Sequence, residues 1–200
     1  LAAVTHTEGP LLVIAGAGSG KTRTLTYRAA YLVEKGVPPA AILLLTFTRK
    51  ASQEMLRRAS QLLDARCGKI AGGTFHSFAN AALRQYASYM GLDPAFGILD
   101  RNDSESLISL LRKELQPATQ QRSFPRRKTL VDIFSRAVNK GLSLEEIIEI
   151  DYPHFESHVE TINRLYQLFE IRKKEHHFLD YDDLLVYLRR LLGDYPDAQD

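Results

Sequence analysis

Residues 13–33, "VIAGAGSGKTRTLTYRAAYLV", run from an apolar segment through a glycine turn into a helical pattern. Residues 11–15 are apolar throughout, which predicts a strand covered on both faces of a sheet. Helical periodicity follows over residues 21–34. The glycines between these segments allow left-handed backbone angles and close approach of a ligand. A strand, a glycine turn and a helix in this order favour a phosphate-binding site.

The turn matches the phosphate-binding pattern G-x-x-x-x-G-K-[ST], except that Ala15 stands at the first glycine position. The dinucleotide fingerprint G-x-G-x-x-G fails, because counting from Gly16 places Lys21 where the third glycine belongs. In a phosphate-binding turn, backbone N–H groups and the helix dipole hold phosphate oxygens. Lys21 is placed to reach the β and γ phosphates of ATP, and the Thr22 hydroxyl to ligate Mg²⁺. The predicted phosphate-binding residues are Ala15, Gly16, Ala17, Gly18, Ser19, Gly20, Lys21 and Thr22.

The first part of the chain continues the alternation of apolar runs and helical patterns. Further strands are expected at residues 42–46 and 70–74, and further helices at residues 50–63 and 75–89. Such alternation is typical of parallel strands joined by crossover helices. The predicted fold class is therefore α/β.

After "MGLDP" (residues 90–94), helical periodicity takes over. The polar segment "QPATQQRSFPRRK" (residues 116–128) carries two prolines and predicts a loop. The expected helical segments are residues 103–115, 130–140 and 154–174, with a short turn at 144–150 and a last helix at 180–192. The simplest organisation is an α/β domain with an all-helical insertion.

Composition excludes several classes of protein. The chain has 200 residues, 44% of them hydrophobic, which is enough for a packed core. No apolar run approaches the roughly 20 residues of a membrane span, and the single cysteine, Cys67, forms no internal disulfide. We therefore expect a soluble cytoplasmic protein in which Cys67 is a passive thiol at a helix end.

Charge is sorted along the chain, although the net charge is only +2. Between Arg112 and Lys140 there are eight Lys or Arg residues and two acids, whereas between Glu145 and Glu160 there are six acids and no Lys or Arg. The acidic run is expected to be a solvated helix face. The basic cluster Arg126, Arg127 and Lys128 is either a solvated loop or a contact for nucleic-acid phosphates.

Two further stretches place Thr-Phe between an apolar run and a helix: "LLLTFTRKASQEMLRR" (residues 43–58) and "GGTFHSFA" (residues 72–79). Ligands bind at the carboxyl edge of a parallel sheet, so Phe47 and Phe75 are expected beside the phosphate site. An aromatic face there suits an unstacked base, and the alternative is packing in the core. The hydroxyls suited to phosphodiester contacts are those of Thr46, Thr48, Thr74 and Ser77.

With "AGAGSGKTRTLTYR", "LLLTFTRKASQEM", "GTFHSFA" and "FLDYDDLL" in this order, nearly the whole chain resembles the amino-terminal part of superfamily 1 DNA helicases of the UvrD, Rep and PcrA type. The resemblance implies an incomplete RecA-like parallel sheet, with residues 1–90 as motor domain 1A. Residues 91–178 would be the helical 1B insertion, and residues 179–200 a helix returning to 1A. The implied activity is ATP-dependent, 3′ to 5′ translocation on single-stranded DNA with unwinding of the duplex.

Residue by residue, the resemblance assigns Gly18, Gly20, Lys21 and Thr22 to ATP phosphates and Mg²⁺. Arg23 would lie against the adenine. The residues implied to touch DNA are Thr46, Phe47, Thr74, Phe75 and His76. Thr48 and Arg49 are further candidates for this contact, and Arg49 stands where the family commonly has Asn. The implied partners are single-stranded and duplex DNA and a second motor domain of the same polypeptide, with no membrane and no small-molecule substrate besides ATP.

Efficient hydrolysis also needs a strand ending in Asp-Glu and an arginine that reaches the γ-phosphate, and neither is found. Asp182 and Asp183 follow "KKEHHFLDY", which does not predict an apolar strand. We therefore expect a fragment that neither hydrolyses ATP efficiently nor unwinds DNA alone. Three alternatives remain: a helicase-nuclease subunit of the same superfamily, a nucleotide-gated nucleic-acid-binding module without motor activity, and a small-molecule kinase.

Other candidate ligand residues have ordinary structural interpretations. His154 and His158 are four residues apart, but no third metal ligand follows at a suitable spacing. His176 and His177 are expected to be solvated at a helix end. For Asp180 and Asp183 ("DYDD"), a helix N-cap with an acid in the first turn is preferred over a nucleotide contact.

Overall fold

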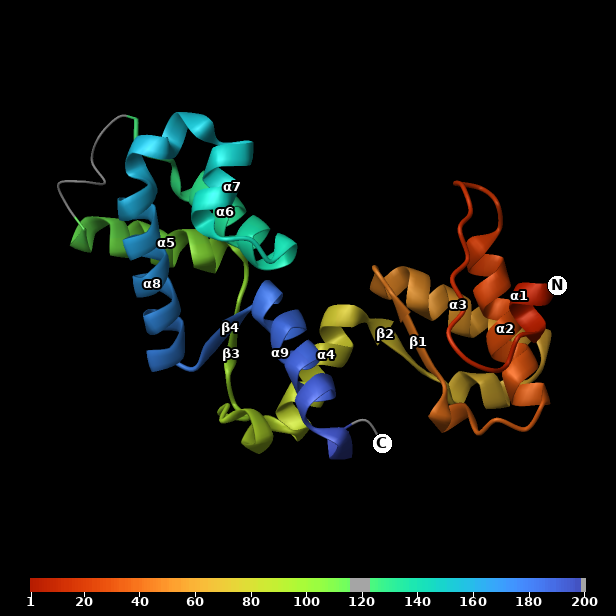
Figure 1. The fold of residues 1–200 in the computed structure, drawn as a ribbon. Helices are drawn as coiled ribbons and strands as arrows, with labels where there is room; N and C mark the ends of the chain where they lie inside the picture. The colour runs from red at the N-terminus through yellow and green to blue at the C-terminus, as the bar shows by residue number, and fades with distance from the viewer. Residues whose placement is uncertain (116–122, 199–200) are drawn as a thin grey trace. The chain divides into compact units, whose positions relative to one another are not determined.

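The structure, a computed structural model, describes residues 1–115 and 123–198. The chain divides into two compact units, Leu1–Phe78 (unit 1) and Ala79–Asp200 (unit 2) (Figure 1). The assignment of residues 1–90, 91–178 and 179–200 to domains 1A, 1B and 1A stays a prediction.

Unit 1 is built on two short parallel strands with helices beside them (Figure 1). Its elements are α1 (Ala2–Thr5), α2 (Lys21–Glu34), β1 (Leu43–Thr46), α3 (Arg49–Leu62), β2 (Ala71–Thr74) and the start of α4 (Phe75–Gln85), with 3₁₀ turns at Pro39–Ala41 and Ala65–Lys69. The register pairs Leu43 with Ala71 and Thr46 with Thr74. The helix predicted at residues 21–34 is confirmed, as are the strands predicted at 42–46 and 70–74, with ends that differ by a residue.

The core of unit 1 is small. Val33 of α2 and Met55 and Ala59 of α3 pack with Leu44 of β1 and with the thiol of Cys67. Cys67 lies in the 3₁₀ turn that follows α3, and burial raises its pKa, so the expected passive thiol fits this position. These contacts fix α2 and α3 against the strands.

The strand predicted at residues 11–15 is wrong. These residues have no regular secondary structure, and the side chains of Leu12 and Ile14 are 84% and 89% exposed. A strand forms only where a neighbouring backbone supplies ladder hydrogen bonds, and no described strand pairs with this segment. Apolar composition was the only signal for the strand, and it does not supply a pairing partner.

Unit 2 is mainly helical, with one short parallel pair, β3 beside β4 (Figure 1). Its elements after α4 are a 3₁₀ turn (Ala87–Met90), β3 (Gly97–Leu99), α5 (Arg101–Glu114), α6 (Arg127–Lys140), α7 (Leu144–Asp151), a 3₁₀ turn (Pro153–His158), α8 (Val159–Glu175), β4 (Phe178–Asp180), α9 (Tyr181–Asp194) and a 3₁₀ turn (Pro196–Ala198). No described helix is long and apolar enough to cross a membrane.

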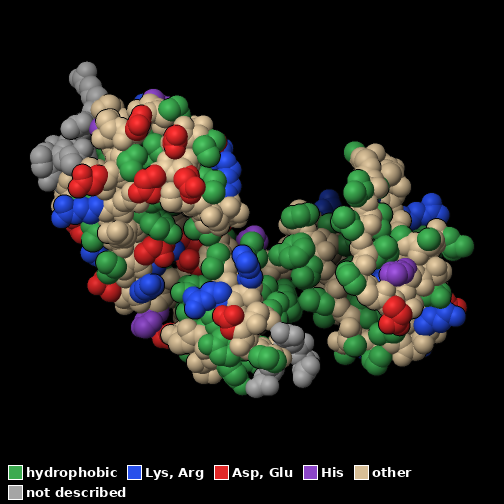
Figure 2. Space-filling model, in the orientation of Figure 1, with side chains coloured by type: hydrophobic (Ala, Val, Ile, Leu, Met, Phe, Trp, Pro, Cys, Tyr) green, Lys and Arg blue, Asp and Glu red, His purple; other side chains and the backbone are tan. Residues whose placement is uncertain are grey.

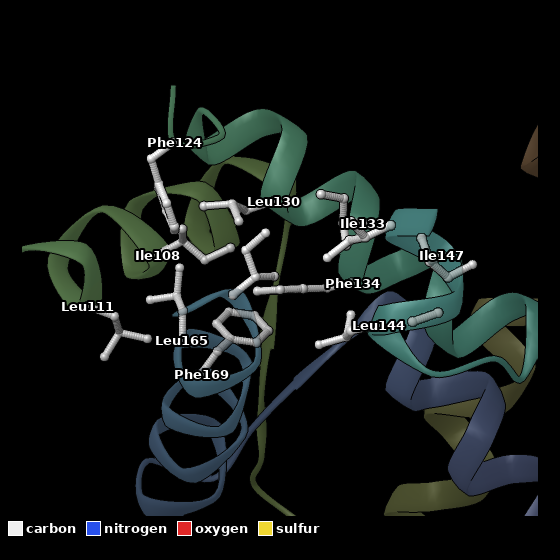
Figure 3. Packing of buried hydrophobic residues seen from close by; sticks show 13 residues of the cluster. Ile108, Leu111, Phe124, Leu130, Ile133, Phe134, Leu144, Ile147, Leu165 and Phe169 are labelled. Atoms are coloured by element: carbon white, nitrogen blue, oxygen red, sulfur yellow. The ribbon is translucent and has the colours of Figure 1, made fainter. Parts of the chain in front are cut away.

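A large hydrophobic cluster joins α5, α6, α7 and α8. Figure 3 shows Ile108 of α5 and Phe134 of α6 facing Leu165 and Phe169 of α8. Full burial of one such side chain stabilises the fold by about 2 kcal/mol. A second cluster, which includes Leu83 of α4, packs α4 and α9 beside β3 and β4. The helical region is therefore a packed body with its own core.

Local capping fixes several helix starts in unit 2. Asp100, Ser143 and Asp180 are N-caps of α5, α7 and α9, and each forms a capping box with the residue three positions later. Because of the Asp100 box, α5 begins two residues before the predicted residue 103. Because of the Ser143 box, residues 144–151 form a helix where a short turn was expected.

Other boundaries also differ from the sequence-based expectations. The helix predicted to 89 ends at Gln85, and the helix predicted from 154 begins as the 3₁₀ turn after Pro153. Residues 116–122 of the predicted loop lie outside the described residues, and the loop assignment is wrong at Arg127 and Lys128, where α6 begins. The strands β3 and β4 were not predicted, because three-residue strands carry no periodic signal.

Candidate functional site

The glycine turn leads directly into α2. Gly18 and Gly20 have φ angles of 76° and 86°, in the left-handed region, and Gly20 is the N-cap of α2. The Ser19 hydroxyl donates a hydrogen bond to the Gly16 carbonyl oxygen at 2.7 Å, which closes the turn. A side chain at either left-handed position would strain the backbone, so the conformation itself favours glycine there.

The turn is open, and its lysine lies over it. A Cβ atom added at Gly16, Gly18 or Gly20 would meet no protein atom within 4 Å. Lys21 Nζ donates hydrogen bonds to the carbonyl oxygens of Ala15 at 2.9 Å and Gly16 at 2.6 Å. Both contacts are exposed, and no described carboxylate pairs with this ammonium. Its charge is therefore available to an anion that enters the turn.

The first turn of α2 is also suited to an anion. It has no acidic residue and no side-chain cap. No described side chain therefore occupies its first N–H groups, which can donate hydrogen bonds to a ligand. Thr22 lies in this turn and offers a hydroxyl oxygen, a donor type that Mg²⁺ accepts. No group of three or more His, Cys, Asp or Glu among the described residues is placed to hold a metal by itself. A Mg²⁺ ion at Thr22 would therefore depend on phosphate oxygens for other ligands.

Next to the turn, Arg23 and Tyr27 line a hollow of about 230 Å³. The Arg23 guanidinium lies 5.4 Å from the centre of the Tyr27 ring. The opposite wall consists of Arg58, Gln61 and Leu62 near the end of α3. A planar cation beside an aromatic ring gives this hollow a surface on which a flat, electron-rich ring can stack.

The ends of β1 and β2 lie at one edge of the sheet, because Thr46 pairs with Thr74 in the register. The Thr46 hydroxyl donates to the Thr48 carbonyl oxygen at 2.8 Å. The Thr48 hydroxyl accepts from the Ala51 N–H at 3.1 Å and is the N-cap of α3. These hydroxyls shape the strand-to-helix turn, so their donor or capping capacity is already used within the protein.

Phe47 and Phe75 follow the paired threonines and lie against each other. Their ring centroids are 5.8 Å apart, with the ring planes inclined at 45°. Phe47 is 93% exposed and Phe75 is 42% exposed, so neither ring fills the core. Core packing, the alternative interpretation of these residues, is wrong. An exposed aromatic pair of this kind offers ring faces to an unstacked base.

A hydrogen-bonded turn positions Phe75. The backbone N–H of Thr74 donates to the Ser77 hydroxyl at 2.8 Å, and the Ser77 N–H donates to the Thr74 hydroxyl at 3.1 Å. A Cβ atom at Gly73 would lie 2.6 Å from the Ser77 hydroxyl, and one at Gly72 would lie 2.8 Å from a methyl of Leu56. The two glycines therefore let α3 and α4 approach β2, a role that the sequence did not reveal.

The remaining predicted DNA residues lie in both units. Arg49 is the first residue of α3, directly after the Thr48 cap, and is exposed. His76 lies in the first turn of α4 and is half-buried. In unit 2, Arg126, Arg127 and Lys128 are exposed at the start of α6, where Arg127 pairs with Glu105 at 3.3 Å. A role in DNA contact stays a prediction for all of them.

The preferred interpretation of Asp180 and Asp183 is confirmed. The Asp180 carboxylate accepts from the Asp183 N–H, and the Asp183 carboxylate accepts from the Asp180 N–H, both at 2.9 Å. Sequence reasoning missed Lys173 of α8, which is 3% exposed and donates to both carboxylates at 2.8 and 2.7 Å. Burial alone would lower the pKa of Lys173, but Asp183, Asp180 and Glu170 raise it above its usual value. The "DYDD" motif is therefore structural.

The histidines show no metal-binding arrangement within the described part of the chain. His158 is buried, its Nε2 lies 3.0 Å from the Ser123 hydroxyl, and its ring meets that of Phe124. His176 and His177 are exposed after the end of α8, as expected. The acidic run was expected to be a solvated helix face. Its residue Asp151 instead forms ion pairs with two basic residues of α6, so this part of the run contacts another helix.

The parallel strand pair, the glycine turn and the helix after it have the pattern typical of α/β proteins with a phosphate-binding loop. Within that class, the chain belongs to a helicase family, because all of residues 1–200 match the family described as UvrD/REP helicase N-terminal domain.

Relatives named "ATP-dependent DNA helicase PcrA" match almost the whole chain. The Bacillus subtilis protein is 37% identical over 199 residues, and those of Staphylococcus epidermidis and Leuconostoc citreum are each 36% identical, over 197 and 198 residues. Each alignment covers 98% of this chain and 26% of the relative. The chain thus spans about a quarter of the length of these relatives.

Proposed function

We propose that this chain supplies the nucleotide-binding turn and part of the single-stranded DNA track of an ATP-dependent DNA helicase. The observation that carries the proposal is the exposed Phe47–Phe75 pair at the paired ends of β1 and β2. Membership of the UvrD/REP helicase family and the names of the relatives support it.

ATP is the proposed nucleotide, bound with Mg²⁺. The open turn and the uncapped first turn of α2 provide the N–H groups for its phosphates. When ATP binds, Lys21 would give up its two hydrogen bonds to exposed carbonyl oxygens and contact phosphate oxygens instead. The loss of those two bonds costs little free energy because water already screens them. Thr22 would provide one oxygen ligand to Mg²⁺, and the hollow beside Arg23 and Tyr27 would accept the adenine ring.

Single-stranded DNA is the proposed track. A base would stack on Phe47 or Phe75, while the hydrogen-bonded Thr74–Ser77 turn holds the second ring in place. Arg49 at the start of α3 would contact a neighbouring phosphate. Stacking does not depend on base identity, which suits a protein that moves along DNA of any sequence. Movement from 3′ to 5′ and unwinding of the duplex by the longer polypeptide, with a second motor domain, complete the proposed activity.

The nucleotide half of the proposal is tested by Lys21→Ala in the longer polypeptide that contains this chain. ATP hydrolysis should fall by about a hundredfold or more, because the β and γ phosphates lose their cation. Affinity for single-stranded DNA, measured by fluorescence anisotropy, should change less than about threefold. The matched control is Lys35→Ala at the other end of α2, which should leave hydrolysis unchanged. Retained unwinding by the Lys21 variant would contradict the proposal.

The DNA half is tested separately by Phe47→Leu, which keeps an apolar side chain but removes the ring. Single-strand affinity should fall about tenfold, since stacking contributes about 1–3 kcal/mol per base. ATP binding without DNA should be unaffected. Leu12→Ala removes another exposed apolar side chain of unit 1 and should not change single-strand affinity. Equal effects of the two substitutions would contradict a specific stacking role.

A further inference from the structure

A cavity of about 180 Å³ lies within unit 2, where α5, α6 and α8 meet the first turn of α9. Its apolar wall includes Ile108, Phe134 and Phe169, which Figure 3 shows converging from three helices. Cavities of about 150 Å³ lined by such side chains accommodate a benzene ring. The space is therefore sufficient for one small ring with a short substituent.

The other wall is acidic. The carboxylates that line the cavity are Asp100, Asp132, Glu170, Asp180 and Asp182, and the cations are Arg101 and Lys173. Both cations are already paired: Lys173 with Glu170 at 2.7 Å and with the α9 cap, and Arg101 with Asp132 at 2.7 Å. The lining thus has three more negative than positive charges, and neither cation is available to an anionic ligand.

A serine hydroxyl is a second, independent feature of the cavity. Ser104 of α5 lines it and is 5% exposed. Ser106 and Ser109 on the same helix donate to carbonyl oxygens one turn back, at 2.8 and 3.0 Å, whereas the Ser104 hydroxyl has no hydrogen bond to a described residue. Because no fully buried side-chain polar atom of the described residues lacks a hydrogen-bond partner, the unpartnered Ser104 hydroxyl must be accessible from the cavity, where it can bind a ligand with a donor or acceptor.

From these three features we infer that the cavity is a binding site for a small organic cation, a primary ammonium attached to a short aromatic or aliphatic group. The ammonium would lie at the carboxylates and the hydrocarbon against Phe134 and Phe169. Lys173 already places an ammonium 4.8 Å from the Phe169 ring centre, which shows that this aromatic wall accepts a cation. The site lies outside the residues proposed for ATP and single-stranded DNA.

Benzylamine and its neutral analogue benzyl alcohol test the inference on the full, unmodified chain. Benzylamine should bind with a Kd of about 1 mM, measured by ligand-observed NMR and calorimetry, and benzyl alcohol should bind at least about tenfold more weakly. Added salt should weaken only the binding of benzylamine. Equal binding of the two probes, or no binding of benzylamine at about 20 mM, would overturn the inference.

Two pairs of variants locate the site. Asp182→Asn keeps an oxygen acceptor for Asn139 but removes one carboxylate, so it should weaken the binding of benzylamine several-fold. Its control is Asp194→Asn at the other end of α9, which should leave that binding unchanged. Ser104→Leu fills the cavity and should abolish binding, whereas Ser106→Leu on the same helix should not. If Ser104→Leu does not fold, the Asp182 pair decides. Unchanged binding in Asp182→Asn would place benzylamine elsewhere and contradict the inference.

Discussion

Unit 1 and unit 2 differ in how much of their apolar surface they bury. In unit 1, consecutive side chains from Leu11 to Ile14 and the rings of Phe47 and Phe75 are exposed, and Figure 2 shows hydrophobic side chains over much of the visible face of this unit. In unit 2, Ile108, Ile133 and other side chains from four helices form a continuous buried cluster. The residues proposed to bind ligands in unit 1 are therefore available because packing does not use them, whereas unit 2 is held by its own contacts.

The largest expected effect compares one isoleucine from each unit. Ile133→Ala should lower the free energy of unfolding by about 3 kcal/mol, because the removed atoms leave a cavity in the core of unit 2. Ile14→Ala should change it by less than about 0.5 kcal/mol, because the side chain is already in water. Urea denaturation of the full chain measures both. A cost at Ile14 as large as that at Ile133 would refute the contrast between the units.

A smaller effect is expected from the ion cluster of unit 2. Burial raises the pKa of Asp183 to about 6, and although Lys173 acts in the opposite direction, the nearby Asp180 adds to the increase. Folded chains then bind more protons than unfolded chains between about pH 4 and pH 6, so the free energy of unfolding contributed by this group falls as the pH rises. Glu170 and Tyr187 also face this cluster.

Asp183→Asn measures this contribution, because the amide retains an acceptor for the Asp180 N–H but does not titrate. Urea denaturation gives the free energy of unfolding of the unaltered chain and of the variant. The difference, unaltered chain minus variant, should decrease as the pH rises from about 4.5 to about 6.5. Asp194→Asn, at the exposed end of α9, should show no such trend. An opposite slope would mean that the lysine dominates and that the pKa of Asp183 is lowered.

The smallest effect concerns backbone strain. The left-handed residues of unit 1 are glycines, such as Gly18 and Gly20, but in unit 2 His177 has a φ of 53° and is the only non-glycine residue with positive φ in the described chain. His177→Gly should raise the free energy of unfolding by about 0.5–1 kcal/mol. Gly141→Ala, at a φ of 66°, should lower it by about 1 kcal/mol. Thermal unfolding of both variants would show whether the packed core of unit 2 compensates for backbone strain at His177.

Local signals predicted the elements of the proposed ATP and DNA site well. The glycine turn, the helix that begins at Lys21 and the Thr-Phe positions after two strands depend on nearest neighbours and on spacing, which the sequence displays directly. The N-cap role of Asp180 was also predictable, because capping acts over three residues. By contrast, the strand at residues 11–15 failed, since a strand requires a partner that its own residues do not specify.

By itself, the sequence determined which residues have the chemistry for phosphates and bases, together with the helices and caps that hold them. Only the tertiary structure decided that Phe47 and Phe75 form an exposed pair, that Lys173 is buried among three carboxylates, and that Ser104 lines an acidic cavity. These features join residues that are distant in the chain. Their burial and pairing depend on how helices and strands pack, and no local sequence pattern encodes that packing.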